Sequence, residues 1–496
     1  MTIHRIESGL HRHCQGSRRE FLWQIGAGFG GLALTGLLDR DGFFTKHGYA
    51  TAPRNSANPL LQRASHSPPK AKHVIFLFMY GGPPSMDTWD YKPELQKRNG
   101  QSIDIETRRR KVTQGKLLGS PRKFRQSGQS GLWGSDAFPN INRCLDEICV
   151  VKSLYADTFA HGSAMIQMNS GRVIQGHPTV GSWIGYGLGS ENENLPAYVV
   201  MVDPRGGPIS GAANWSSGFM PASYQGTHLR SKGEPILDLS PNVKTTRRAQ
   251  RDLIDTLAKL NVRHMLERPG YSELPARIAS YELAFQLQST APEALDLSQE
   301  TARTLQLYGI TGHKVEHKQS LGPEPFGRQC LIARRLIERG VRFVQIYSGG
   351  GHGDQNWDAH GNVDNNLNIH GPEIDKPIHG LISDLAQRGL LDETLIVWGG
   401  EFGRQAVAQS DMGRDHNPLG FLYWLAGGGV KGGHSHGETD PLGHEAVVDR
   451  HHIRDLHATI LHLMGLDHEK LTYFYGGLDH KLTGVQRAEV IHDVIA

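Results

Sequence analysis

Apolar residues follow two patterns along this chain, one typical of buried strands and one typical of amphipathic helices. Continuous apolar runs, several of them β-branched, predict strands at 73–80, 148–154, 196–202, 341–347, 394–398 and 419–426. Helical spacing predicts helices around 164–168 and over 323–340, 374–385 and 454–466. Buried strands that alternate with helices favour a parallel sheet covered on both faces. The sequence therefore predicts an α/β protein with a doubly wound, mostly parallel sheet flanked by helices.

Two internal regions depart from this alternation. Between 242 and 310 the apolar positions are helical, and Leu253, Ile254, Leu257 and Leu260 share one face. We expect an inserted helical subdomain over the sheet there. Residues 95–135 are polar and basic without strong periodicity, which predicts a surface excursion. The main domain is expected over 73–484, followed by a C-terminal tail at 485–496.

The N-terminal region resembles a twin-arginine export signal. Arg18 and Arg19 precede Glu20, Phe21 and Leu22, and a weakly apolar, glycine-rich run follows. We expect residues 1–52 to be this signal and residues 53–72 to be a linker. The run is too short and glycine-rich for a stable membrane span, although a buried helix that begins with two arginines is the alternative. The expected partner is the twin-arginine export machinery, and the expected location is the periplasm or the cell surface.

Charge and cysteine content exclude several classes of protein. The 496 residues include 53 basic and 50 acidic side chains, a net charge of +3, so nothing indicates binding to nucleic acid. The four cysteines contain no Cys-x-x-Cys pair, which disfavours a zinc-thiolate site. The 27 histidines are unusual, and they favour a metal or acid/base site because imidazole is a common metal ligand.

The strand expected at 394–398 delivers a carboxylate to a functional position. A double glycine ends this strand and places Glu401 directly after it, and His416 follows in a polar segment that we expect to be a loop. Ligands of open α/β sheets bind beyond the carboxyl ends of the strands. Glu401 and His416 are therefore candidate site residues.

Two other strand exits carry possible metal ligands. After 341–347, a glycine-rich segment holds His352, Asp354, Asp358 and His360 within nine residues. Imidazole with carboxylate suits zinc, iron or manganese better than calcium, so a divalent metal ion is expected. After 73–80, Asp87 follows two glycines, although a turn or helix-capping aspartate is the alternative there.

A fourth strand exit leads into a helix that begins near His161 and Ser163. The first turn of a helix has unpaired backbone N–H groups and the positive end of the helix dipole, so it favours an anion. This helix start is therefore a candidate anion site or, alternatively, Ser163 is only a cap residue.

Placed together, these segments resemble the alkaline phosphatase and sulfatase superfamily, and most closely its exported, sulfatase-like branch of unknown function. The segment from 374 to Arg404 is similar to the superfamily's helix, strand and Asp-His-Gly end. The segment from His416 to Gly433 resembles its histidine loop, and 454–466 resembles its Asp-Leu-x-x-Thr-Ile-Leu helix. The resemblance implies an alkaline phosphatase-like fold with a metal cluster that hydrolyses phosphate or sulfate esters.

Carried over by position, the resemblance implies specific roles. Asp358 and His360 match one ligand pair, Glu401 matches the aspartate of Asp-His-Gly, and His416 matches the late histidine. Asp87 would replace an aspartate that is missing from the end of the first strand. The nucleophile position falls on His161, with Ser163 two residues away. Phe402 stands where a histidine would bind a second metal, so a one-metal site is expected.

These observations predict an exported, metal-dependent hydrolase of sulfate or phosphate esters. The cofactor would be one of zinc, manganese, iron or calcium, and the ligand an anionic ester, either a sulfated or phosphorylated small molecule or a polysaccharide. One alternative is a catalytically degenerate protein that binds anionic polysaccharide at the cell surface. Another is a metal-dependent oxidoreductase or isomerase, for which the sequence has no redox motif.

Overall fold

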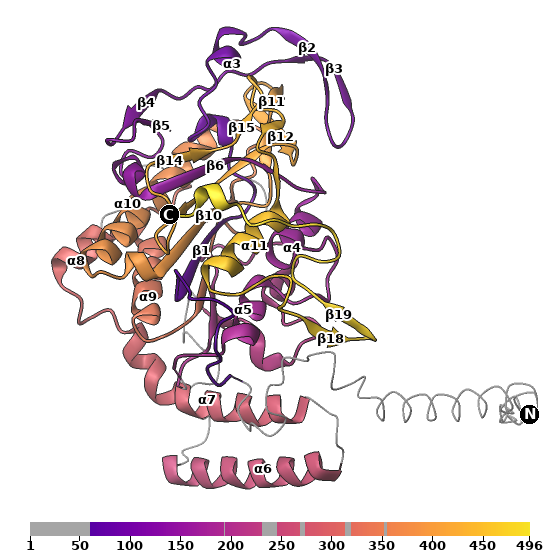
Figure 1. The fold of residues 1–496 in the computed structure, drawn as a ribbon. Helices are drawn as coiled ribbons and strands as arrows, with labels where there is room; N and C mark the ends of the chain where they lie inside the picture. The colour runs from indigo at the N-terminus through magenta and orange to yellow at the C-terminus, as the bar shows by residue number, and fades with distance from the viewer. Residues whose placement is uncertain (1–59, 193, 231–245, 268–272, 313–318, 352–354) are drawn as a thin grey trace, which may run out of the picture. The chain divides into compact units, whose positions relative to one another are not determined.

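A mostly parallel sheet forms the centre of the computed structural model, which describes residues 60–192, 194–230, 246–267, 273–312, 319–351 and 355–496 (Figure 1). Within these residues the sheet has nine strands in the order β14-β6-β13-β10-β1-β9-β7-β8, and β17 also pairs with β6. The strands are β1 (His73–Met79), β6 (Ile148–Tyr155), β7 (Tyr198–Met201), β8 (Thr227–Leu229), β9 (Phe343–Ser348), β10 (Thr394–Gly399), β13 (Phe421–Ala426), β14 (His434–His436) and β17 (His451–His452). Only β13 runs antiparallel to its neighbours in this sheet.

Helices cover both faces of the sheet, which confirms the predicted α/β fold. They are α4 (His161–Ser170), α5 (Val180–Leu188), α6 (Arg247–Glu267), α7 (Glu273–Leu295), α8 (Ala302–Leu307), α9 (Pro323–Ile337), α10 (Val363–Gln387) and α11 (Ile453–Leu463). Alternate residues of β1 point to opposite faces. Ile75 and Leu77 belong to one hydrophobic core, which includes Ile378 of α10, whereas Val74 belongs to the other, which includes Ile460 of α11.

Residues 95–135 lie at the surface, but they are more ordered than the sequence predicts. They include the end of α3 (Pro93–Lys97) and two antiparallel hairpins, β2 (Ser102–Glu106) with β3 (Lys111–Lys116) and β4 (Phe124–Ser127) with β5 (Leu132–Ser135). Both faces of these hairpins are largely exposed. The alternation of apolar and polar residues that normally reveals a strand is therefore weak here.

His416 lies on a strand, and the predicted loop at this position is wrong. β11 (Gly403–Gln409) and β12 (Gly413–Asn417) form a hairpin after β10, and Arg404 pairs with His416 in its register. The buried positions of this hairpin include Arg404 and Arg414, both fully buried. Arginine is rare at such positions, which is why the sequence did not indicate strands.

The remaining segments complete the body. The short strands β15 (Glu438–Thr439), β16 (Ala446–Val448), β18 (Tyr473–Tyr475) and β19 (Leu478–His480) form two further hairpins. Helices α6, α7 and α8 occupy the region expected to be a helical insert. Residues 60–72, expected as linker, lie against the body, since the Arg63 N–H donates to Leu188 O (2.8 Å) and the Ala71 N–H to Leu463 O (2.8 Å).

Three further features are the export signal, membrane-spanning helices and the cysteines. The expected export signal lies outside the described residues. Where the structure is described, no helix is long and apolar enough to cross a bilayer. Cys144, Cys149 and Cys330 are buried free thiols, so Cys144 and Cys149 do not pair.

Candidate metal centre

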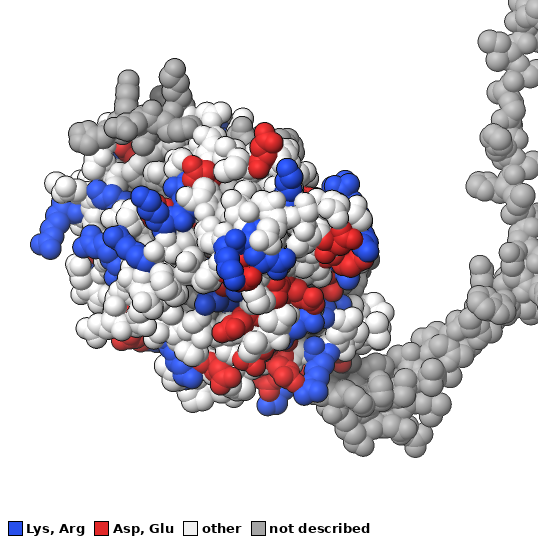
Figure 2. All heavy atoms as spheres, turned by 90° about the horizontal axis from the view of Figure 1, so that it is seen from above, with Lys and Arg blue, Asp and Glu red and all other residues white. Residues whose placement is uncertain are grey.

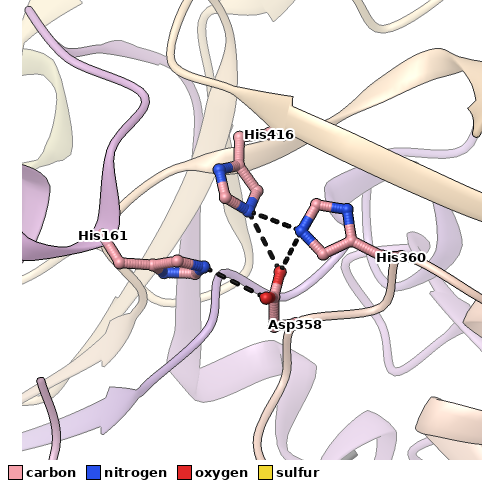
Figure 3. A group of neighbouring side chains, drawn as sticks. All are labelled: His161, Asp358, His360 and His416. Atoms are coloured by element: carbon pink, nitrogen blue, oxygen red, sulfur yellow. Dashed lines mark hydrogen bonds and ion pairs between the residues drawn. The ribbon is translucent and has the colours of Figure 1, made fainter. Parts of the chain in front are cut away.

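Four side chains converge at the carboxyl edge of the sheet and form what we call the metal group (Figure 3): His161, Asp358, His360 and His416. His161 is the first residue of α4, which follows β6. Asp358 and His360 lie between β9 and α10, and His416 lies on β12. One ligand atom of each side chain lies within 4.8 Å of the others. Among the described residues, no other group of three or more His, Cys, Asp or Glu side chains meets this criterion.

The carboxylate of Asp358 is the centre of the metal group. His161 Nε2 lies 3.2 Å from Asp358 Oδ2, and His360 Nε2 lies 2.9 Å from Asp358 Oδ1. His416 Nε2 lies 3.0 Å from the same Oδ1 and 3.0 Å from His360 Nε2. Three imidazole nitrogens of the same type thus surround one carboxylate.

The second nitrogen of each imidazole determines what Nε2 can do. Nδ1 of His161 lies 2.6 Å from Glu401 Oε1, and Nδ1 of His416 lies 2.8 Å from Phe159 O. Nδ1 of His360 is hydrogen bonded to Gln409 Oε1. All three partners are oxygen acceptors, so each Nδ1 carries a hydrogen and each neutral ring presents a lone pair at Nε2. This arrangement is the one that orients histidines toward a metal ion.

The Asp358 carboxylate and the three converging imidazole nitrogens require positive charge between them. Burial raises the pKa of a carboxyl, but hydrogen bonds from the three histidines and the charge of Arg404 hold the pKa of Asp358 well below its usual range. Burial opposes the charged form of His161, yet hydrogen bonds to Asp358 and Glu401 raise its pKa to about 9. Burial lowers the pKa of His416 to about 4. Either protons or a metal cation can supply the charge between these atoms.

Arg404 and Phe402 border the metal group. The Arg404 guanidinium is fully buried and donates to Asp358 Oδ1 (2.6 Å) and to Gly82 O (2.9 Å). The Phe402 ring stacks on His416 with 4.3 Å between ring centroids and lies 5.0 Å from the His161 ring. Phe402 therefore covers the histidines with an apolar surface, and its own side chain cannot bind a metal.

Glu401, expected to bind the metal directly, lies one shell farther out. Both of its oxygens accept from the Gly81 N–H, at 3.0 and 3.1 Å, and Oε1 accepts from His161 Nδ1. The side chain is fully buried. Glu401 thus fixes the orientation of His161. The sequence indicated that Glu401 stands at the strand end, but it did not show that His161 lies between Glu401 and Asp358.

Asp87 is not part of the metal group. It lies in a short 3₁₀ helix (Ser85–Asp87), and its carboxylate accepts from Arg414 Nε (2.8 Å) and Nη2 (3.2 Å). Both side chains are fully buried. A paired carboxylate of this kind stabilises the turn after β1 and holds β12 in place. We therefore omit Asp87 from the proposed ligands.

The other candidates have different positions. Ser163 lies in the first turn of α4, two residues after His161, and is partly buried. It is not the N-cap, which is Ala160. His352 and Asp354 lie outside the described residues. His434 and His436 lie on β14, and His451 and His452 form β17.

The donor set fits a transition metal. Three imidazole nitrogens and one carboxylate suit zinc, iron or manganese, whereas calcium prefers a shell of oxygens. The orientation of all three Nε2 atoms supports the same conclusion, because each outer hydrogen bond selects the tautomer that a metal requires.

Comparisons with known proteins give one family and several distant structures. No curated protein matches the sequence. The lipoteichoic acid synthase LtaP from Listeria monocytogenes is 8% identical, with 87% of this chain and 80% of that chain covered and a TM-score of 0.34. The PsFucS1 sulfatase from Pseudoalteromonas sp. is 12% identical (84% and 73% covered, TM-score 0.34). A TAB5 alkaline phosphatase mutant with bound magnesium is 9% identical (80% and 99% covered, TM-score 0.31).

The family assignment covers nearly the whole described body. A family model with the description "Protein of unknown function (DUF1501)" matches residues 71–495. This range begins just before β1 and includes every residue of the metal group. The chain therefore belongs to the DUF1501 family.

Proposed function

We propose that this protein is an exported, metal-dependent hydrolase of sulfate or phosphate esters that uses a single metal ion. One observation carries the proposal: three histidines are fixed by outer hydrogen bonds so that their Nε2 atoms converge on Asp358. Such a set would hold zinc, manganese or iron. The bound ion would polarise the ester oxygen and stabilise the charge that develops on it.

The residues around the ion would have separate roles. His161, Asp358, His360 and His416 would be the ligands. Both nitrogens of His161 are engaged, Nδ1 with Glu401 and Nε2 with Asp358, so we propose it as a ligand in place of the expected nucleophile.

Ser163 is the remaining candidate nucleophile. Its hydroxyl belongs to the first turn of α4, where unpaired N–H groups favour the negative charge of a sulfate or phosphate group. Two positions earlier in the same helix, His161 would bring the ion to the same region. A hydroxyl near a metal ion is a suitable nucleophile because the ion favours its deprotonated form.

The second candidate function is a binding protein that retains the metal group without turnover. Phe402 favours it, since this ring lies on His416 and His161 where the resemblance would place a second metal ligand. Such a protein would still bind one metal ion and an anionic ligand at the same edge of the sheet.

Metal analysis of the natively exported protein, followed by assays on an aryl sulfate and an aryl phosphate, tests the proposal. We expect close to one transition-metal ion per chain and turnover of one ester. His360→Ala should lose most of the metal and the activity, and the control His434→Ala, which changes a histidine outside the metal group, should keep both. Full metal retention in His360→Ala would rule out the metal group.

Two further variants separate the remaining parts of the proposal. Ser163→Ala should bind metal normally but lose turnover, and unchanged turnover would rule out Ser163 as nucleophile. Bound metal without turnover of either ester would favour the binding protein. Arg18→Lys with Arg19→Lys should keep the protein in the cytoplasm, and normal export of this variant would contradict the twin-arginine signal.

A further inference from the structure

The β2–β3 hairpin carries four consecutive basic residues, Arg108, Arg109 and Arg110 in its turn and Lys111 at the start of β3, which we call the basic tip. All four are exposed. The hairpin projects from one end of the molecule in Figure 1, and Figure 2 shows the surface seen from that end, where basic side chains gather in clusters between acidic ones. A run of exposed charges is often only a solvated surface, so the residues around the basic tip must show whether it can bind a ligand.

The neighbours of the basic tip are the segments that carry the metal group. Arg108 Nε donates to Asp157 O (3.3 Å), and Asp157 lies four residues before His161. Arg109 Nη1 lies 3.9 Å from Asp415 Oδ2, and Asp415 directly precedes His416. The basic tip therefore lies at the rim of the metal group, next to two of the three segments that carry its side chains.

The hairpin is attached to the body by a hydrophobic cluster of its own. Ile105 and Leu117 are buried in this cluster with Met86, Ala406 and Val407. The N–H of Leu118, just after β3, donates to Ala406 O (2.9 Å). Since Ala406 and Val407 belong to β11, the partner of β12, the same hairpin that positions His416 also positions the basic tip.

The basic tip has more positive charge than its surroundings neutralise. Two carboxylates face it: Asp415, and Glu106, which stands opposite Lys111 in the strand register. The Asp157 carboxylate is engaged by Gln167 Nε2 (2.5 Å) and lies 3.2 Å from His452 Nε2. Within the described part of the chain, Arg110 and Lys111 have no carboxylate within 4.0 Å. Arg109 pairs with Asp415 and Arg108 donates to a backbone oxygen, so the side chains of Arg110 and Lys111 are available to an anion.

We propose that the basic tip binds a second anionic group of a polysaccharide that carries several sulfate or phosphate groups, while one ester lies at the metal group. The inference rests on the proposed function for the role of the metal group, and it adds that the substrate is a polyanion. Nucleic acid fits this surface less well, because residues 102–116 contain no aromatic side chain on which a base could stack.

The test measures binding of the full-length, metal-loaded protein to dextran sulfate, to polyphosphate and to uncharged dextran at several salt concentrations. The variant Arg110→Gln with Lys111→Gln removes the two unpaired cations. We expect its affinity for the preferred polyanion to fall about tenfold at low salt, and its salt dependence to be weaker than that of the wild type, because fewer counterions are released. The control Arg248→Gln with Lys259→Gln removes the same two charges from exposed positions on α6 and should stay within about twofold of the wild type.

The outcomes separate this inference from the proposed function. Weaker binding of the tip variant, with unchanged metal content and unchanged turnover of a small aryl ester, supports the inference. Equal losses in the tip variant and the control, or no loss in either, would overturn it even if the protein hydrolyses aryl esters. Failure of the wild type to hydrolyse any ester would contradict the proposed function without affecting the binding result. Preference for dextran sulfate or for polyphosphate identifies the anionic group, and tighter binding of single-stranded DNA than of either would overturn the assignment to a polysaccharide.

Discussion

Two clusters at the carboxyl edge of the sheet are built from histidines and carboxylates, yet they differ in how their charges are satisfied. The metal group has three imidazoles around one carboxylate. The second cluster, which we call the Asp203 network, contains Asp203, Arg205, His370 and Glu373. In it, Arg205 donates two hydrogen bonds to Asp203 (2.8 Å each) and two to Glu373 (3.2 and 2.8 Å).

The difference shows that residue types alone do not identify a metal site. In the Asp203 network a guanidinium already supplies the cation, and the backbone N–H groups of Gly349 and Leu321 donate to the same carboxylates. In the metal group Arg404 contacts one oxygen of Asp358, but the imidazole nitrogens face one another. A closed ion-pair network stabilises the fold, whereas converging lone pairs require a cation from outside.

The largest effect is expected where the closed network is broken. Arg205→Met removes the guanidinium that lies between two buried carboxylates and should destabilise the protein by about 3 to 5 kcal/mol. The metal content of the folded fraction should not change. Urea unfolding measures the first quantity, and metal analysis of the folded protein measures the second.

The control for this prediction is Arg328→Met. Arg328 pairs with Glu324 on the surface of α9, with about half of its side chain exposed, so the expected loss is below about 1 kcal/mol. If Arg205→Met were as mild as Arg328→Met, the Asp203 network would not be the stabilising counterpart of the metal group.

Much of the fold could be predicted because buried parallel strands are continuously apolar. β1, β6, β9, β10 and β13 all lie within two residues of the predicted runs. The hairpins β2–β3 and β4–β5 could not be predicted, since their faces are exposed and carry no apolar alternation. β11 and β12 were missed because their buried positions include two arginines, each paired with a carboxylate.

The site was predicted only in part, for a physical reason. A sequence shows which side chains lie near strand ends, so Asp358, His360, Glu401, His416 and His161 could all be named. It does not show which of them touch. Glu401 and His161 are 240 residues apart, and their hydrogen bond decides that one orients the other. Asp87 is a carboxylate that follows a strand, as a metal ligand would be. Its carboxylate instead accepts a hydrogen bond from Arg414, which comes 327 residues later in the chain.

A buried histidine outside both the metal group and the Asp203 network extends the comparison between them. His457 on α11 donates from Nε2 to Met168 O (2.8 Å), near the far end of the helix that begins with His161. Burial lowers the pKa of His457 from 6.5 to about 4. The unfolded chain therefore binds a proton below pH 6.5 that the folded protein does not bind until about pH 4. Stability should fall as the pH drops through this window, by on the order of 3 kcal/mol from His457.

His457→Gln tests this assignment because the glutamine amide can also donate to Met168 O but does not titrate. The free energy of unfolding of the variant should fall less steeply between pH 6.5 and 4 than that of the wild type, and the two curves should run parallel above pH 6.5. Parallel curves over the whole range would mean that His457 is not held neutral by burial.

The smallest of the three expected effects is that of a change at Glu401, which orients His161 from outside the metal group. Glu401→Gln keeps an oxygen that can accept from His161 Nδ1 but removes the negative charge that makes the imidazole a better ligand. Metal affinity should fall about 10- to 100-fold, as is typical when an outer partner of a metal-binding histidine is changed. Competition with a chelator measures the affinity. Glu393→Gln, which neutralises an exposed carboxylate paired with Lys72, is the matched control and should bind metal as the wild type does. If the two variants bind metal equally well, Glu401 has only a structural role, and the metal group resembles the Asp203 network more closely than its geometry indicates.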